Sequence, residues 1–593
     1  MKVHLAGTDL PDVVDVVIAG SGASGMATAI TAAFQGAQVA VLEKAEKFGG
    51  TTARSGGWLW IPGTPLAAAL GIEEPPGAAR DYIAHEAAGH FNAGRTQAFL
   101  ENGPKAVEFF ARHTHVQFDM PRSFPDYHAE ARGGRPGGRS MVTRPWDGRE
   151  LGDAIAHLAP ALPELTVLGM MLASGDEIRH FTRAFRSWSS FRYVAARLLR
   201  HGRDVLRYGR GMTLTNGNAL AARLARSALD LGVPIYLRSR VQSLLVEGGR
   251  VAGVRVRTPA GERIVRARQA VVLACGGFPH DVARRQALFP HVSRGQGHYS
   301  PSPSGNTGDG LALAEALGVR VDGSIAHAAA WTPVSTPTRR NGDKGVMPHF
   351  IDRAKPGVIA VTRHGRRFVN ESLSYHDFAI AMMEACRGDD EVSAWLLCDH
   401  ATLRRYGLGR VAPFPVPYGH HLRTGYLRRA GSIAALANEI GVPADVLQAE
   451  VARFNADARA GSDTVFGKGT TAYNRFQGDA LHGPNPCLAP LQQGPYYAIR
   501  LLVGDIGTFA GLPTDVAGQV LYPDGTAVPG LYAVGNDAAS IMGGSYPGAG
   551  ITLGPALVFG YVLGNHLART PAGVQPDGPV AVQASRPQDL FAK

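Results

Sequence analysis

Residues 15–43 read DVVIAGSGASGMATAITAAFQGAQVAVLE, and this stretch decides the fold. Asp15–Ala19 is a short apolar run rich in β-branched residues, as expected of a buried parallel strand. A glycine-rich turn follows, then a helix-like stretch to Gln35, and then a second apolar run that ends at Glu43. The order of strand, GxGxxG, helix, strand and acid predicts a Rossmann-like α/β unit.

The three glycines of this motif have separate roles. Gly20 permits a tight turn, Gly22 lets the backbone approach a pyrophosphate, and Gly25 lets the helix pack closely on the strand. The helix N-terminus directs N–H groups and positive potential at the phosphates. Glu43 lies 18 residues after Gly25, where its carboxylate can accept a hydrogen bond from a ribose hydroxyl. The stretch predicts dinucleotide binding without deciding between FAD and a nicotinamide.

Three further segments resemble the fumarate reductase and succinate dehydrogenase flavoprotein superfamily, which implies FAD. Gly49–Gly57 is similar to its second phosphate-contacting loop, Ala270–Gly277 to its glycine-rich return to the cofactor, and Gly530–Asp537 to the loop over the ribityl chain. The resemblance covers nearly everything from 12 to about 568. Members with covalent FAD use a histidine where this chain has Thr51 and Thr52, so we expect non-covalent FAD.

The motif and the resemblance together give the expected FAD-binding residues. They are Gly20, Ser21, Gly22, Ala23, Ser24, Gly25, Glu43, Lys44, Gly50, Thr51, Thr52, Ser55, Gly56, Gly57, Val241, Ala274, Gly276, Gly277, Asn306, Asp309, Gly535, Asn536, Thr552 and Leu553. By the resemblance, the last two offer backbone N–H groups to the flavin pyrimidine.

At 593 residues the chain is too long for a single core. We expect a Rossmann-like α/β FAD-binding domain at 12–325 plus 488–568, with a basic helical excursion at about 150–212. An α+β catalytic and substrate domain is expected as an insertion at 326–487. The segment 569–593 is rich in Pro, Ala and Gln without periodicity, so it is expected to be a mobile tail.

Composition narrows the class of protein. With 45% hydrophobic and 18% charged residues the chain is typical of an α/β enzyme. It shows neither a secretory signal pattern nor an unbroken apolar run long enough to span a bilayer. The cysteines lie far apart without a CxxC pair, which argues against a metal site and fits a reducing cytoplasm. They are Cys275, Cys386, Cys398 and Cys487.

Most of the net charge of +11 lies between Arg179 and Arg210, a segment with nine arginines and one acid, Asp204. The segment is also rich in aromatic and aliphatic residues, which favours peripheral contact with the inner face of a membrane. The alternative is a surface helix whose arginines are solvated or paired. Charge alone would also permit a flavin-containing nucleic-acid modification protein, but the usual nucleic-acid motifs are absent, so no nucleic-acid partner is expected.

Two departures exclude a dicarboxylate reductase. In fumarate reductases the acid arginine follows a GxRFxNE stretch, and this chain has Gly365–Tyr375, with Tyr375 in place of that arginine. The stretch Gly504–Leu512 likewise lacks the histidine with which the reductases bind carboxylate. This chain therefore lacks the side chains that would bind a carboxylate substrate.

The same region resembles the 3-ketosteroid Δ1-dehydrogenases. Phe124–His128 (FPDYH), Asn370–Tyr375 (NESLSY) and Gly543–Pro555 (GGSYPGAGITLGP) carry this resemblance. It implies that Tyr546 and the N–H of Gly550 bind the ketone oxygen, that Tyr375 is the base for the C2 proton, and that Tyr127 is its hydrogen-bonded helper. With flavin accepting hydride from C1, the implied reaction is FAD-dependent 1,2-desaturation of a 3-ketosteroid.

This arrangement is physically sound. Gly550 is expected to open a helix at Ile551–Leu563, so that its N–H points at the ketone oxygen from a helix N-terminus. Two preorganised donors, Tyr546 and Gly550, would stabilise the enolate that forms when a proton leaves the neighbouring carbon.

The substrate is less well defined than the reaction. The Δ1-dehydrogenases are expected to have GTKGG where this chain has Gly507–Gly511 (GTFAG), and Phe509 in place of lysine removes a charge and adds bulk. Alternatives are a cyclohexanone-like ketone, a 4-ene-forming ketosteroid dehydrogenase, and a flavin-binding module without turnover. The partner expected is a hydrophobic cyclic ketone, and the electron acceptor is undefined.

Overall fold

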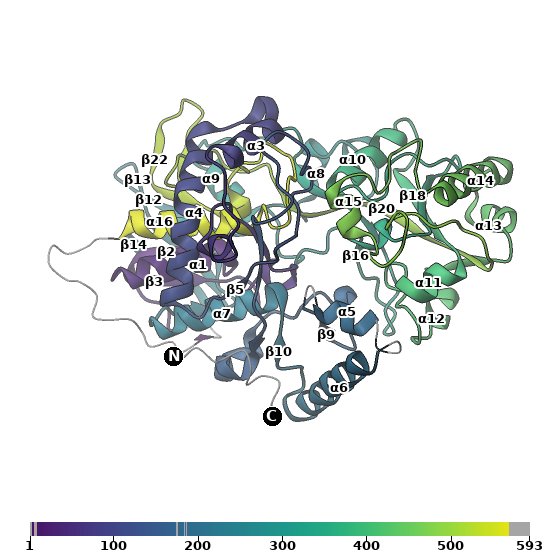
Figure 1. Ribbon diagram of the computed structural model, residues 1–593. Coiled ribbons are helices and arrows are strands. Elements are labelled where there is room, and N and C mark those ends of the chain that lie inside the picture. Colours follow the sequence, from purple (N-terminus) through teal and green to yellow (C-terminus); the bar gives the residue numbers. More distant parts are fainter. Residues whose placement is uncertain (1–2, 5–8, 174–175, 183, 185–186, 569–593) are drawn as a thin grey trace.

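The computed structural model describes residues 3–4, 9–173, 176–182, 184 and 187–568. The chain forms two lobes, each built on its own large sheet (Figure 1). The expected mobile tail, 569–593, lies outside the described residues, as do residues 183 and 185–186 of the basic segment.

The first sheet has nine strands and contains the Rossmann-like unit. The strand β2 (Val13–Ala19) lies between β3 (Val39–Leu42) and β14 (Gly261–Leu273) and is parallel to both. From the other end of the chain, β22 (Ala527–Ala533) pairs in parallel with β14. The remaining strands are β1 (Val3–His4), β11 (Ile235–Tyr236), β12 (Arg240–Glu247), β13 (Arg250–Thr258) and β21 (Gln519–Leu521).

Helix α1 (Ala23–Phe34) follows β2 directly and packs along α16 (Leu553–Leu567). Both helices are rich in small residues, which lets their backbones approach closely. A Cβ on Gly560 would lie 2.6 Å from Ala27 Cβ and 2.8 Å from Ser24 O, so only glycine fits there. The α/β unit predicted from residues 15–43 is confirmed, and the C-terminal helix completes it.

The second sheet has six antiparallel strands in the order β16 (Met347–Pro348), β15 (Ala329–Ser335), β20 (Tyr496–Thr508), β18 (Ser393–Cys398) and β17 (Val358–Thr362), with β19 (Arg428–Ala430) beside β20. Around it lie α10 (Tyr375–Ala385), α11 (His400–Tyr406), α12 (Gly419–Arg423), α13 (Ile433–Ile440), α14 (Ala444–Ala460) and α15 (Ala472–Gln477).

The chain returns to the first lobe later in the sequence than expected. The boundary at 488 would place 496–508 in the FAD-binding part, but β20 pairs with β15 and β18 in the second sheet. The strand therefore belongs to the second lobe up to Thr508. The local sequence pattern identifies a strand but not its partners. The pairing of β20 depends on residues distant in the chain, and this pairing decides where the domain boundary lies.

Further strands and helices lie outside the two large sheets. The short strands are β4 (Trp58–Trp60), β5 (Phe118–Asp119), β6 (Ser140–Thr143), β7 (Trp146–Asp147), β8 (Thr166–Val167), β9 (Met170–Met171) and β10 (Thr213–Leu214). The helices are α2 (Pro65–Ala69), α3 (Ala78–Ala87), α4 (Ala93–His113), α5 (Asp176–Thr182), α6 (Trp188–Tyr208), α7 (Asn216–Asp230), α8 (Val282–Leu288) and α9 (Asp309–Glu315).

The basic segment forms α6, which Figure 1 shows at the lower edge of the molecule, away from both large sheets. Among the described residues, no helix has both the length and the apolar character needed to cross a bilayer.

Substitution of Gly560 tests the contact between α1 and α16. G560A should lower the free energy of unfolding by roughly 1–3 kcal/mol, because the added methyl group must displace backbone or Ala27. Gly202 provides a control: it lies in α6 with no atom within 4 Å of a built Cβ, so G202A should raise stability by up to about 1 kcal/mol. Urea denaturation measures both. Equal stability of G560A and wild type would contradict the tight packing.

Candidate active site

The predicted phosphate site lies where β2 passes into α1. A Cβ on Gly22 would meet only Thr52 Oγ1, at 3.7 Å, and one on Gly50 only Gly22 Cα, at 4.0 Å. The two glycine backbones therefore face each other across open space, which fits a pyrophosphate at the N-terminus of α1. The loop from Gly50 to Gly57 contains no histidine.

The acid after β3, Glu43, organises the end of the groove where the ribose is expected. One oxygen of Glu43 accepts hydrogen bonds from the N–H and the hydroxyl of Ser21, and the other accepts from the N–H of Ala45 at 2.9 Å. A carboxylate has about four acceptor positions, so capacity remains for a ribose hydroxyl. Lys44 forms an ion pair with Asp309 at 2.8 Å. These residues gather at one edge of the first sheet, as the motif predicts.

Two returning loops close the other side of the groove. Asp537, in the 3-10 turn Gly535–Asp537, is fully buried and accepts hydrogen bonds from the N–H groups of Cys275 at 2.6 Å and Gly277 at 2.9 Å. Asn306 donates to Thr51 Oγ1 at 2.8 Å. The predicted residues of both loops thus come together. Asp537, which ties them, was not among the predicted site residues because it acts through protein groups.

The end of the groove lies at the start of α16. Thr552 is the N-cap and Leu553 the first helical residue, so first-turn N–H groups are available to a flavin ring. The expected helix start at Ile551 is wrong. Gly550 has φ +97° and its carbonyl accepts the N–H groups of Gly554 at 2.8 Å and Trp60 at 3.1 Å, so regular helix begins only after this turn. Gly550 therefore precedes the helix.

The three predicted tyrosines meet beside this point. Tyr375 is the first residue of α10, Tyr127 lies in the loop between β5 and β6, and Tyr546 lies in the turn before α16, and each is at most 6% exposed. The ring centroids are 5.0 Å apart for Tyr375 and Tyr546, and 5.7 Å apart for Tyr127 and Tyr375. The hydroxyl of Tyr127 donates to that of Tyr375 at 3.5 Å.

The hydroxyls differ in their surroundings. Burial raises the pKa of Tyr375 and of Tyr127 well above the usual value, so both are neutral phenols at pH 7. Burial also raises the pKa of Tyr546, but hydrogen bonds with Tyr375, Thr552 and the N–H of Gly550 lower it in part. The Tyr546 hydroxyl is thus near the backbone N–H of Gly550, as a shared binding site for one oxygen requires.

Other rings enclose the cluster and were not predicted. The ring centroid of Tyr473 lies 4.4 Å from that of Tyr127, and that of Phe350 lies 5.0 Å from that of Tyr375. Phe509 and His376 lie 6.1 and 6.2 Å from Tyr546. Burial lowers the pKa of His376 to about 3, so its ring is neutral. The GTFAG stretch marks Phe509, but no sequence motif marks the other three residues, because they share only a position in space.

A chain of hydrogen bonds joins the three tyrosine segments. Glu86 Oε2 accepts from Ser545 Oγ at 3.0 Å and lies 2.8 Å from His128 Nδ1. His128 Nε2 lies 2.9 Å from Asp377 Oδ2. Because Ser545 precedes Tyr546, His128 follows Tyr127, and Asp377 lies two residues after Tyr375, this chain fixes all three segments relative to one another.

His128 carries the positive charge of this chain. Burial alone would lower its pKa, but hydrogen bonds to Asp377 and Glu86 raise the pKa to about 10. The imidazolium in turn holds the pKa of Asp377 below its usual value, against the effect of burial. The site is therefore braced by one cation between two carboxylates.

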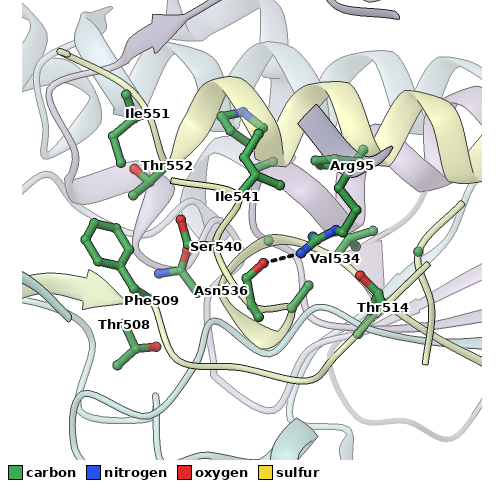
Figure 2. A pocket seen from close by; sticks show the side chains of 18 residues that line it. Arg95, Thr508, Phe509, Thr514, Val534, Asn536, Ser540, Ile541, Ile551 and Thr552 are labelled. Atoms are coloured by element: carbon green, nitrogen blue, oxygen red, sulfur yellow. Dashed lines mark hydrogen bonds between the residues drawn. The ribbon is translucent and has the colours of Figure 1, made fainter. Parts of the chain in front are cut away.

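A small pocket adjoins the groove on the side of α16. Figure 2 shows Thr508, Phe509 and Thr552 on one side of it, and Arg95 and Thr514 on the other. Asn536 and Ser540 lie between the two groups.

Comparison with known proteins agrees with the geometry. The family described as "FAD binding domain" matches residues 15–553. The chain is 42% identical to 4-oxocyclohex-2-ene-1-carboxylate 5-dehydrogenase of Sinomonas cyclohexanicum, over 94% of either chain. It is 36% identical to 3-oxosteroid 1-dehydrogenase of Mycobacterium tuberculosis, over 93% of this chain and 98% of the relative.

A solved structure is similar over the whole fold. The 3-ketosteroid Δ1-dehydrogenase of Sterolibacterium denitrificans, in complex with 1,4-androstadiene-3,17-dione, has a TM-score of 0.86 and 34% identity. The match covers 94% of this chain and 100% of that one. The expected FAD cofactor and the expected fold are thereby confirmed.

Replacement of His128 tests the charged network that it forms with Glu86 and Asp377. H128Q should lower the free energy of unfolding by about 3 kcal/mol near pH 6.5, because two carboxylates lose their cation. Since folding raises the pKa of His128 from 6.5 to about 10, its stabilisation is fully present below about pH 6.5 and is lost as the pH rises through about 10. Denaturation of both proteins at pH 6.5 and pH 10 measures this. A difference between them that does not shrink at pH 10 would contradict the charge assignment.

Proposed function

Because this chain belongs to the 3-ketosteroid Δ1-dehydrogenase family of FAD-dependent oxidoreductases, which act on CH–CH groups, we propose that it desaturates the 1,2-bond of a 3-ketosteroid. The observation that carries this proposal is the buried cluster of Tyr127, Tyr375 and Tyr546 beside the N-terminus of α16. Each tyrosine has one role in it.

The ketone oxygen binds between Tyr546 and Gly550. The hydroxyl of Tyr546 lies near the N–H of Gly550, so an oxygen placed between them can accept from both. Gly550 is confined there by its neighbours, because a Cβ would lie 2.4 Å from the backbone carbonyl of Trp58. Two fixed donors in a site without bulk water stabilise the negative charge that develops on the oxygen.

Tyr375 takes the proton from the carbon next to the ketone. Only the phenolate can accept this proton, so Tyr375 first loses its own hydroxyl proton to solvent and returns to the neutral phenol in the transfer. Burial disfavours the phenolate, so this step depends on groups that stabilise its charge. Tyr127 is such a group, because its hydroxyl donates to Tyr375 at 3.5 Å. The position of Tyr375 at the start of α10 also stabilises its phenolate, because a helix N-terminus favours negative charge.

The glycine-rich turn at Gly20–Gly25 and the first turn of α16 would hold FAD without a covalent bond, and the cofactor would supply the redox chemistry by taking up the hydride from the β-carbon. The substrate thereby loses one proton, to Tyr375, and one hydride, and the two ring carbons form a double bond. The protein contributes the two donors, the base, and a closed aromatic wall that excludes water.

The surroundings of the tyrosines favour an uncharged, hydrophobic ketone. Their ring neighbours are Phe350, Phe509, Tyr473 and neutral His376. An aromatic ladder of Trp58, Phe124 and Phe476, with centroids 4.4 and 4.8 Å apart, extends from the Tyr127 loop to the surface, where Phe476 is 44% exposed. Such a ladder can hold the further rings of a steroid.

The second candidate is a monocyclic ketone of the cyclohexanone type. The relative of Sinomonas cyclohexanicum bears the name of an enzyme for such a ring, and Phe509 fills space beside Tyr546. That relative's substrate is a carboxylate, whereas the aromatic shell around this cluster is neutral. The shell is therefore the reason to prefer the steroid.

We further propose that α6 rests on an anionic membrane surface. An ordinary surface helix buries apolar side chains, whereas α6 buries polar ones. Its inner face holds Arg197, His201 and Asp204, all at most 8% exposed. Arg197 pairs with Glu177 at 2.9 Å, and Asp204 pairs with Arg149.

The outer face of α6 is apolar and basic. Trp188, Leu199 and Leu206 are 72%, 76% and 91% exposed, and Leu168 beside the helix is 76% exposed. Arg192, Arg203 and Arg207 are exposed among them. Exposed apolar side chains flanked by arginine fit an interfacial helix, which would receive a hydrophobic ketone from the bilayer.

Conservative loss of two hydroxyls tests the catalytic roles. Y375F should abolish turnover of a 3-ketosteroid while FAD stays bound, and Y546F should lower the rate by roughly 10²-fold through loss of one donor. Y522F, in the β21–β22 hairpin, is the matched control and should keep the wild-type rate. Steady-state rates and flavin content measure this. A near-normal rate in Y375F would refute the base.

Vesicle flotation tests the membrane contact. Wild type should float with anionic vesicles at low salt, and the triple variant W188S/L199S/L206S should bind at least about tenfold more weakly, because each large apolar side chain contributes more than 1.4 kcal/mol when buried. V282S, at an exposed valine of α8, serves as the control and should float like wild type. Absence of wild-type flotation would dismiss the contact.

A further inference from the structure

Arg95 is a buried cation in an unfavourable place. It is the third residue of α4, 7% exposed, in the first helical turn, where the helix dipole disfavours positive charge. Within the described part of the chain no carboxylate forms an ion pair with it. Burial lowers its pKa to about 10, which leaves the guanidinium charged at neutral pH.

The hydrogen bonds of Arg95 do not compensate for the burial of its positive charge. Arg95 Nη1 donates to the carbonyl of Ala539 at 2.6 Å, and the guanidinium lies 5.1 Å from the ring centroid of Phe559. Its Nε has no hydrogen-bond partner among the described residues. Asp515 and Asp322 favour the charged form only from a distance. Retaining such a group is costly, so a partner of opposite charge is expected.

The pocket beside Arg95 leads to the flavin site. Arg95 lines the same pocket as Thr508, Asn536 and Thr552, of which the last two were predicted to bind FAD (Figure 2). Thr514 Oγ1, also in the wall of this pocket, is a second buried polar atom without a partner. Two orphan polar atoms in one pocket indicate that its contents are polar.

We propose that Arg95 is an electrostatic positioning residue for FAD, whose charge stabilises the reduced flavin through the pocket behind α16. Hydride transfer adds two electrons and one proton to the flavin, so the ring gains one negative charge unless a second proton follows. The first turn of α16 and Arg95 line one pocket next to residues expected to hold the flavin, so both would be close enough to stabilise this charge. Few counter-charges screen the guanidinium in this low-dielectric pocket, so its effect extends beyond contact distance.

The midpoint potential of the bound flavin tests this inference without any ketone. R95M and R95Q should lower the potential, with reduction at least about tenfold less favourable, which is about 30 mV for a two-electron couple. R95K keeps the charge and should restore most of the wild-type potential. The reduced flavin of R95M should also take up a second proton at a higher pH than that of wild type, visible in its absorption spectrum.

Arg223 provides the control. It is also a buried arginine whose pKa burial lowers to about 10, but it donates to the carbonyls of Arg144, His115 and Pro145 and does not line the pocket. R223M should keep the wild-type potential even if it is less stable.

The outcomes separate charge from shape. Loss of FAD from R95M with retention in R95K would also support the inference. Equal potentials in R95M, R95Q and wild type, or loss of FAD from R95K as well as from R95M, would overturn it. Since no substrate takes part, these outcomes are independent of the proposed ketone chemistry.

Discussion

The active site depends on one imidazolium held between two carboxylates. His128 lies 2.8 Å from Glu86 and 2.9 Å from Asp377, and Glu86 also accepts from Ser545. Through these bonds the first lobe, the second lobe and the C-terminal turn are joined at one point. The tyrosine of each segment stands within two residues of a member of this chain, so the hydroxyls keep their spacing as long as it holds. A charged network of this kind specifies geometry more than it adds stability.

The cofactor groove also depends on a small number of residues. Glycines at 22 and 50 leave space where a side chain would stand, and Asp537 joins two loops that are about 260 residues apart in sequence through two N–H groups. Helix α16 then contributes twice, because its packing on α1 closes the α/β unit and its N-terminus adjoins the tyrosines. In the function that we propose, binding of FAD and placement of the ketone share one helix, which would couple the redox step to the acid–base step.

The sequence was most informative where chemistry is local. The strand, turn and helix at residues 15–34 form as predicted, because their pattern and their contacts lie in the same stretch. The meeting of Tyr127, Tyr375 and Tyr546 followed from family resemblance rather than from spacing, and the structure brings them together. Their roles stay proposals.

Long-range contacts account for what the sequence did not predict. The domain return at 488 was wrong because β20 pairs with β15 and β18, whose residues lie about 100 or more positions away in the sequence. Tyr473, Glu86 and Arg95 carry no motif, and each gains its place only from the neighbours that folding supplies. The helix after Gly550 starts later than predicted because the dihedral of one glycine, φ +97°, adds a turn.

We propose that the buried tyrosine cluster holds a ketone beside FAD for desaturation. Anaerobic mixing of the wild-type enzyme with 3-ketosteroids, with the same steroids lacking the 3-ketone, and with monocyclic ketones tests it most directly. A 3-ketosteroid should bleach the flavin in a single turnover and yield the 1,2-unsaturated product, and the steroid without the ketone should leave the flavin oxidised. Bleaching by monocyclic ketones alone would assign the second candidate. Failure of every ketone to bleach the flavin would contradict the account.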